Sequence, residues 1–575
     1  MKALTKKQRY ELLRSQLNEE MIQFKGYWQE LSSNILPRRS RFFVDDVNRG
    51  DRRNLEIIDS TATLASRTLS SGMMAGVTSP ARQWFKLTTD TLKLNDIPEV
   101  KSYLSIVEEK MRSVFLKSNL YQVLPVLYGD LGTFATGCIF MEEDMDSVIN
   151  FTCFPIGSYM IANDKKGRVR VFVRDFQMSV RQIIEKFGML PNGEVDWTKI
   201  SEAVRSQYEK QQYETMVNVT HIVCPNEDYK PNRVESKFKK FKSVYYEQGV
   251  SSKALASGMT TNDDVFLSEK GYDFFPVLCV RWEVAGEDTY GTNSPGMVSL
   301  GDVKQLQFGE KRSAQAVDQK VRPSMVGPVS LQNANASILP GDITYLDERE
   351  GTKGFRRLFE VDFDIRELEN KQAQLRDRIS KAYYEDLFLM LANSDRSQIT
   401  AREIDERHEE KLLALGPVLE RINQDLLDPM IENTYLIMER QGLLPDAPDA
   451  LAGEDYVIEY VSVMAQAQKL AGIGQIERFL GFVGQVASFD PTVIQKVNLE
   501  ESIEQYANLI GISPELLKTK LEMAKIKEQQ AQAAQREQQM AEAGAMVQAG
   551  KALSETKMDE NTALNRVLGN GGQIV

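Results

Sequence analysis

Apolar side chains recur at helical spacing through most of the N-terminal part of the chain. In residues 5–32 they return every three or four positions among charged partners, which indicates an amphipathic helix. The same spacing predicts helices over residues 51–69, 97–118 and 120–136, and Pro98 suits the first turn of its helix. The pattern therefore favours a largely helical N-terminal region.

After residue 137 the apolar period changes from helical to two, which is typical of strands with one buried face. Strands are predicted at residues 138–142, 148–154, 159–162, 169–176, 213–217, 218–224, 243–247 and 277–282. The run Asn163–Gly167 suits a hairpin turn, and residues 179–187 form a short helical pattern. This middle region is predicted to be a small antiparallel β lobe with long excursions.

Two later helical patterns have similar lengths and enclose a region of different composition. Residues 297–320 and 365–391 would span about 36 Å and about 40 Å at the rise of an α-helix. The region between them, residues 325–363, is rich in Gly, Pro and Asn and is predicted to be loop with short strands. We expect the two helices to form an antiparallel pair with a small domain at its tip.

The C-terminal part begins after a short polar break at residues 393–398. A long helix is predicted over residues 400–440, with an apolar stripe from Leu412 to Met430 and a kink at Pro417. Residues 455–461 have the pattern of a strand. Further helices are predicted at 463–470, 474–486, 499–509 and 513–540, followed by a Gln- and Gly-containing tail that has little to bury.

Length and composition set limits on this picture. A chain of 575 residues exceeds the size of one hydrophobic core, so several lobes are expected. A content of 42% hydrophobic and 26% charged residues excludes a wholly disordered chain. Apolar runs long enough to cross a bilayer do not occur, and the basic start leads into a charged helix, so we expect a protein of the cytosol in the cell that makes it.

The candidate chemistry is sparse. The phosphate-binding pattern GxxxxGK[ST] is absent, and its lookalike Gly309–Ser313 lies within a helical pattern. The acidic residues Glu142, Glu143, Asp144 and Asp146 are interpreted as a solvated turn, with a metal-dependent nuclease site as the alternative. The basic run Lys237–Lys242 favours an amphipathic strand over a nucleic-acid contact.

The cysteine and histidine residues do not indicate a metal, redox or catalytic site either. The four cysteines have no metal-ligand or redox spacing, and we expect them to behave as small apolar side chains. His221 lies in a strand pattern and His408 in a charged helix, so both are interpreted as scaffold residues. The sequence therefore predicts no cofactor, no metal and no catalytic residues.

Three segments carry a more specific signal. They are Ser71–Leu87, Tyr128–Gly137 and Tyr290–Gly296. In the first, Gly72 and Gly76 are expected to loosen a helix end and the pair Trp84–Phe85 to form an apolar anchor. Taken together and in this order, the segments resemble the signature of the portal, or head-to-tail connector, proteins of short-tailed double-stranded DNA bacteriophages. The resemblance covers most of residues 54–440 and is weak beyond them.

The resemblance implies an α+β portal-type fold with a helical wing, a small antiparallel β lobe, antiparallel stem helices and a mostly helical crown. The implied parts, in chain order, are a wing (1–296), a first stem helix (297–321), a clip (322–363), a second stem helix (364–391), a channel loop (392–399), a long wing helix (400–445), a crown (446–540) and a flexible tail (541–575).

The function implied by the resemblance is a non-enzymatic ring of about twelve copies at one capsid vertex, through which the genome enters and leaves. Its partners would be capsid protein, scaffold, terminase, tail adaptors and channel DNA, and no membrane. It would be located in the virion, and in the host cytoplasm during assembly.

The net charge of −12 suits a channel that repels phosphate. Carried over by position, the channel contacts would be Asn393, Ser394, Arg396 and Gln398, and the clip docking residues Asp347, Glu348, Arg349 and Glu350. The alternatives are a metal-dependent DNA-processing enzyme and a helical scaffold protein.

Overall fold

The computed structural model describes residues 5–44, 53–89, 97–249, 266–321, 365–393, 415–451 and 456–461, the short pieces 325–326, 356–357 and 481–486, and the single residues 50, 94, 479, 498 and 502. The chain divides into two compact units, Met1–Gly472 and Ile473–Val575. Nearly all described residues belong to the first unit, so the fold is given for that unit alone.

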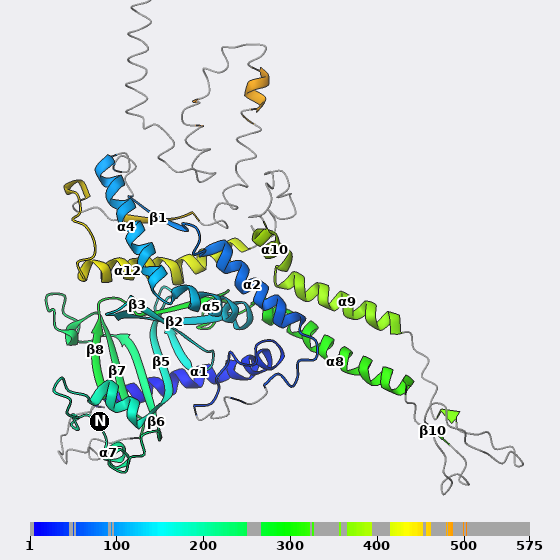
Figure 1. Ribbon diagram of the computed structural model, residues 1–575, viewed down its shortest axis with the longest axis horizontal. Helices are drawn as coiled ribbons and strands as arrows, with labels where there is room; N and C mark the ends of the chain where they lie inside the picture. The colour runs from blue at the N-terminus through cyan, green and yellow to red at the C-terminus, as the bar shows by residue number, and fades with distance from the viewer. Residues whose placement is uncertain are drawn as a thin grey trace, which may run out of the picture. The chain divides into compact units, whose positions relative to one another are not determined.

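Four helices precede the sheets, close to where apolar spacing predicts them. They are α1 (Lys6–Asn34), α2 (Thr61–Val77), α4 (Pro98–Lys117) and α5 (Leu120–Phe134). Thr5 begins α1 with a capping box, in which its hydroxyl accepts from the backbone of Gln8 and the Gln8 side chain accepts from the backbone of Thr5. In Figure 1 α2 crosses beside α5, and α4 lies apart from α1.

The predicted second helix is wrong at both ends. Residues 53–60 are not helical, and in this segment Ile58 and Asp59 donate their backbone N–H groups to the Gln307 side chain at 2.7 and 2.8 Å. Gly72 does not loosen a helix end: α2 continues through it to Val77. A Cβ at Gly72 would lie 2.4 Å from the Phe388 side chain, so this glycine permits close packing.

The end of α5 also differs from the predicted range, which runs to residue 136. The helix ends at Phe134, and Ala135 takes the left-handed conformation after it, with φ 60°. Gly137 already belongs to strand β2, where a Cβ would lie 2.5 Å from the Leu127 side chain. Glycine is needed at residue 137 for space, which a local reading of the sequence does not reveal.

The β lobe is confirmed as antiparallel and consists of two sheets. The first has the order β4-β5-β6-β7-β8 and the second the order β3-β2-β9. The strands are β2 (Thr136–Asp144), β3 (Val148–Phe154), β4 (Tyr159–Asn163), β5 (Val169–Ser179), β6 (Met216–Pro225), β7 (Phe241–Glu247), β8 (Ser268–Tyr272) and β9 (Val277–Arg281). The two strands predicted between residues 213 and 224 are therefore one, and β8 was not predicted because its pattern is mostly polar.

Short helical elements lie at both ends of the five-stranded sheet. At the end where β6 begins are α6 (Val180–Ile183), the π-turn η1 (Ile184–Gly188) and α7 (Glu202–Glu209), and at the end where β7 begins is the 3-10 turn η2 (Ser236–Phe238). The first three, with the start of β6, enclose a small separate core that includes Ile183, Ile200 and Val204.

A two-stranded sheet joins distant parts of the chain. Strand β1 (Phe85–Thr89) pairs antiparallel with β12 (Tyr456–Tyr460), which was predicted as a strand. Trp84 and Phe85 are buried and their rings lie 4.6 Å apart, with Phe115 beside them. This confirms the predicted aromatic anchor.

The predicted antiparallel helix pair is confirmed. Helix α8 (Pro295–Val321) and helix α9 (Ile365–Ala382) run side by side in Figure 1. Between them in sequence, β10 (Met325–Val326) pairs with β11 (Arg356–Arg357). The second helix is not continuous to residue 391: Tyr384, with φ 54°, separates α9 from α10 (Glu385–Asn393).

Residues 415–440 are helical, as predicted, with a π-turn η6 (Asn423–Leu427) before α12 (Asp428–Arg440). The turn before Pro417, where its kink is predicted, lies outside the described residues, and the described helix has an irregularity farther along, at η6. Pro429 explains its position, because proline has no N–H to donate and its ring crowds the carbonyl group four residues back. The η7 3-10 turn (Asp449–Leu451) follows α12.

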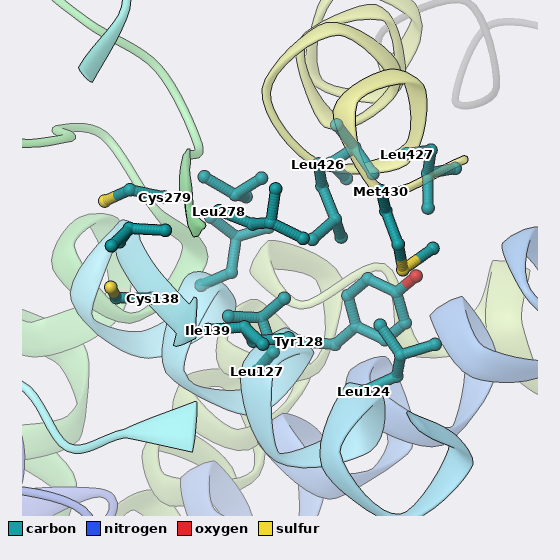
Figure 2. Close-up of a cluster of buried hydrophobic side chains, with 14 of the residues drawn as sticks. Leu124, Leu127, Tyr128, Cys138, Ile139, Leu278, Cys279, Leu426, Leu427 and Met430 are labelled. Carbon is teal, nitrogen blue, oxygen red and sulfur yellow. The ribbon is translucent and has the colours of Figure 1, made fainter. Parts of the chain in front are cut away.

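One large core connects the helices to the three-stranded sheet. Figure 2 shows Leu124, Leu127 and Tyr128 of α5 beneath Leu426 and Met430, with Ile139 of β2 and Leu278 of β9 alongside. In the part of the chain that the structure describes, none of the helices has the length and apolar character needed to cross a membrane.

Candidate functional site

The second and third signature segments, far apart in sequence, meet where α8 begins against α5, and the first segment packs against α5 nearby. The Ser294 hydroxyl donates to the Thr133 carbonyl at 3.0 Å, and the Gly291 N–H donates to the Thr136 hydroxyl at 2.9 Å. The first segment joins them through the hydroxyl groups of Thr78 and Tyr128, 3.0 Å apart. All of these residues are buried. We call this place the root junction.

Two glycines set how closely the backbones approach at the root junction. A Cβ at Gly291 would lie 2.0 Å from the Ala135 carbonyl oxygen, and one at Gly296 would lie 2.6 Å from the Thr133 carbonyl oxygen. Real Cβ atoms do not come so near backbone atoms, which have little room to move. The third segment therefore needs glycine at both positions in order to seat α8 on the end of α5.

An ion pair with a buried carboxylate and a half-buried arginine lies beside the root junction. Asp130 of α5 is 1% exposed and accepts from both the Nε and the second guanidinium nitrogen of Arg39, the Nε contact measuring 2.9 Å. Burial raises the pKa of Asp130 to about 6, while the charge of Arg39 and hydrogen bonds from Arg39 and Cys153 oppose that rise. The pair ties the loop after α1 to the second segment.

Polar contacts also tie the base of the helix pair to the start of α2. Arg376 of α9 contacts Asp59 at 2.9 Å and Glu310 of α8 at 2.6 Å. Burial raises the pKa of Asp59, but hydrogen bonds from Thr61 and Arg376 outweigh it and hold that pKa below its usual value. The Gln307 side chain donates to the Asp59 carbonyl at 2.7 Å. The helix pair is thus attached to the body by charge-assisted contacts.

On either side of the Arg376–Glu310 contact, α8 and α9 are joined by two more polar bridges. Arg378 and Asp302 form an ion pair at 3.1 Å, and Gln372 donates to Ser313 at 2.8 Å. Sequence reasoning missed these residues and Arg376, because their charged and polar types resemble those of an exposed helix face. The only local signal was the Asp59-Ser60-Thr61 run, which is typical of a helix start.

Most of the predicted contact residues lie outside the described part of the chain. Asn393 is the last residue of α10, and Ser394, Arg396 and Gln398 follow it beyond the described residues. Asp347, Glu348, Arg349 and Glu350 also lie outside the described residues, as does His408. Phe388 of α10 packs against Gly72, so α10, the last described element before residue 394, lies against α2.

The acidic residues between β2 and β3 have structural contacts. Glu143 forms an ion pair with Arg440 at 2.9 Å, and the Asp144 carboxylate accepts from the backbone and the hydroxyl of Ser147. Within the described ranges, His, Cys, Asp and Glu side chains do not gather in a group that could hold a metal ion. These contacts favour the turn interpretation of the acidic run.

The basic run, His221 and the phosphate-loop lookalike also lie within secondary structure. Lys242 of the basic run is buried and paired with Glu269, and Lys239 contacts Asp273 at 2.8 Å. His221 is buried in β6, where it stacks on Tyr245 with ring centres 3.9 Å apart. Gly309–Ser313 lies inside α8 and forms no loop. The strand and scaffold interpretations are therefore confirmed for Lys242 and His221.

Comparison with known proteins gives consistent matches along nearly the whole chain. The family described as bacteriophage head to tail connecting protein matches residues 7–517. The portal protein of Salmonella phage epsilon15 is 42% identical over 570 residues, which cover 99% of each chain. The protein named "Probable portal protein" of Bordetella phage BPP-1 is 40% identical over 526 residues, covering 92% of this chain and 91% of the relative.

Among solved structures, the neck of an empty GTA particle is similar over 74% of this chain and 86% of its own, with a TM-score of 0.33 and 10% sequence identity. A TM-score this low supports no conclusion about this chain, so the comparison rests on the relatives found by sequence.

Proposed function

Because this chain belongs to the bacteriophage head-to-tail connecting proteins, we infer that it works as a portal protein, a structural connector between the capsid and the tail. The observation that carries this function is the 42% identity to the epsilon15 portal protein over 99% of both chains. These relatives give no support to a DNA-processing enzyme or a helical scaffold.

The arrangement of the described elements supports the domain assignment that we propose. The helices and sheets before residue 296 form the wing, and α8 and α9 form the stem. The β10–β11 pairing between the two stem helices suits a clip over residues 322–363 at the end of the stem. Residues 392–399 form the channel loop, 400–445 the long wing helix, 446–540 the crown and 541–575 a flexible tail.

The portal function requires a closed ring, and the stem offers surfaces for it. Val298 and Phe308 of α8 are 67% and 60% exposed in the single chain, and Val321 is exposed as well. Large apolar side chains on a helix that already has one partner suit burial against a neighbouring copy. Identical head-to-tail contacts close into a ring when the rotation between copies permits it, here with about twelve subunits.

The channel loop is the part proposed to meet DNA. Asn393, Ser394, Arg396 and Gln398 are polar, and Arg396 brings one positive charge per subunit to a chain of net charge −12. Exposed charges are screened beyond about 8–10 Å at physiological salt, so each contact with phosphate would be weak. Many weak contacts around a ring would steady a moving duplex without holding it.

The clip is proposed to dock the terminase during packaging and the tail adaptors afterwards. The terminase would hydrolyse the ATP, since this chain lacks the phosphate-binding pattern. Asp347, Glu348, Arg349 and Glu350 would supply a charged docking surface there. The ring would occupy one vertex of the virion capsid, after assembly with capsid and scaffold proteins in the host cytoplasm.

Charge reversal in the clip tests this function. Replacing Asp347, Glu348 and Glu350 by Lys should leave the subunit folded, because the clip lies between complete helices, while DNA-filled heads disappear. Reversing Glu185, Glu194 and Glu202, exposed on the wing, is the matched control and should leave filled heads at the wild-type level. A normal yield of filled heads from the clip variant would remove the docking role from these residues.

A further inference from the structure

Two of the four cysteines face each other across neighbouring strands. Cys138 of β2 and Cys279 of β9 are direct partners in the register of the three-stranded sheet, although 141 positions separate them in sequence. Both side chains are buried, and Figure 2 shows them on the same side of the core. Burial raises the pKa of the Cys138 thiol, and the neighbouring Cys279 adds to that rise.

The hydrogen-bond pattern shows which kind of pair they form. Met141 donates to the Pro276 carbonyl and Trp282 donates to the Ala135 carbonyl, each at 2.8 Å, so 141/276 and 135/282 are hydrogen-bonded pairs. Such pairs alternate along an antiparallel ladder, which makes Cys138/Cys279 a non-hydrogen-bonded pair. In pairs of this kind the Cα atoms lie about 4.5 Å apart, within the range that a disulfide requires.

The other two cysteines do not share this geometry. Cys153 is opposite Ile139, and side chains alternate between faces along a strand, so Cys153 and Cys138 lie on opposite faces of the sheet. Cys153 contacts Asp130 and Arg39 instead. Cys224 pairs with Lys242 in the five-stranded sheet. Only the Cys138–Cys279 pair among the four is placed for closure.

We propose that Cys138 and Cys279 are a modification site, at which a reversible cross-strand disulfide closes under oxidising conditions. The bond would join β2, which follows the second signature segment, to β9, which leads into the third. It would therefore cross-link the two strands beside the root junction covalently. If the chain is carried in a virion, as proposed above, the bond would close after release from the reducing cell. The chemistry itself does not depend on that function.

Oxidation by the azo compound diamide gives a balanced route for the test. One thiolate adds to a diamide nitrogen to form an S–N bond. The second thiol sulfur attacks the first sulfur, the S–N bond breaks, and the resulting hydrazine retains both hydrogens. Burial raises the pKa of the Cys138 thiol, so the thiolate is scarce and closure should be slow at neutral pH and faster at higher pH.

The experiment treats the purified full-length protein with diamide, denatures it in acid, alkylates the remaining thiols and maps the digested peptides. We expect alkylated thiols to fall from four to two per chain, one linked peptide that contains Cys138 and Cys279, and reversal by a phosphine reductant. Four alkylated thiols after prolonged exposure at raised pH, or links dominated by Cys153, Cys224 or a second chain, would overturn the proposal.

Single variants sharpen the result. Cys224→Ser should retain the Cys138–Cys279 link, whereas Cys138→Ser should leave Cys279 alkylated. Peptide mapping of the wild-type chain decides the question even if a buried Cys138→Ser variant does not fold. The oxidised wild type should also show a higher unfolding midpoint that returns to its starting value after reduction.

Discussion

At the scale of single residues, the root junction depends on glycines, whose lack of a Cβ atom lets two backbones approach closely. Gly296 lies where the Thr133 carbonyl leaves no room for a Cβ, while Gly301, one and a half turns later in α8, has open space around it. The two positions look alike in the sequence. What distinguishes them is the backbone of another helix, which no local pattern describes.

The variant Gly296→Ala should therefore destabilise the protein, by about 1–3 kcal/mol, because backbone must shift to relieve the clash. Gly301→Ala is the matched control and should be neutral or stabilising by up to about 1 kcal/mol, because alanine is the better helix former. Thermal unfolding followed by circular dichroism measures both. Equal midpoints for the two variants would show that α8 does not seat closely on α5.

The Arg39–Asp130 pair gives a second prediction at this scale. Arg39→Met would leave a buried carboxylate without its partner, which typically costs about 3–5 kcal/mol of folding stability. The double variant Arg39→Met with Asp130→Leu removes both charges and should recover most of that loss. Denaturant unfolding of the single and double variants checks this. A double variant as unstable as the single one would mean that the pair itself, and not the unpaired charge, governs stability.

At the scale of elements, strands and amphipathic helices were predicted well where apolar residues follow a regular pattern. Strand β3 alternates between buried and more exposed residues, β2 and β9 contain continuous apolar runs that are buried on both faces, and α1 and α4 follow helical spacing. The errors occur where packing against another element determines where a helix begins, breaks or ends. The helix break at Tyr384 and the continuation of α2 through Gly72 both depend on how α9 and α10 pack against α2, and neither has a local signal.

The helix over residues 415–440 provides the test at this scale. Leu419 and Leu426 belong to the large core, so Leu419→Asp with Leu426→Asp would bury two charges without partners and cost several kcal/mol. Leu436→Asp, in α12 at a position 41% exposed, is the control and should change stability little. Size-exclusion profiles and melting curves of the three proteins measure the effect. Unchanged behaviour of the double variant would contradict a core position for this helix.

At the scale of the whole molecule, the family was predictable from sequence because three segments, taken together and in order, resemble its signature. Their residues are glycines, hydroxyls and aromatics that fit α2, α5, β1 and α8 together, so they signal the connector fold and not a catalytic site. The clip and channel-loop residues could not be placed in the same way. Their proposed roles arise between copies of the chain and with other molecules, and a single chain contains neither.

The most direct test of the portal assignment is electron microscopy of the purified full-length protein, with the particle mass measured in parallel. We expect closed rings with a central hole in top view and a mass close to twelve times 65.2 kDa. A map of such rings should place residues 393–398 at the wall of the hole, with Arg396 directed inward. Particles that remain single chains at high concentration, or rings with Arg396 on the outer surface, would contradict the ring and the channel contact respectively.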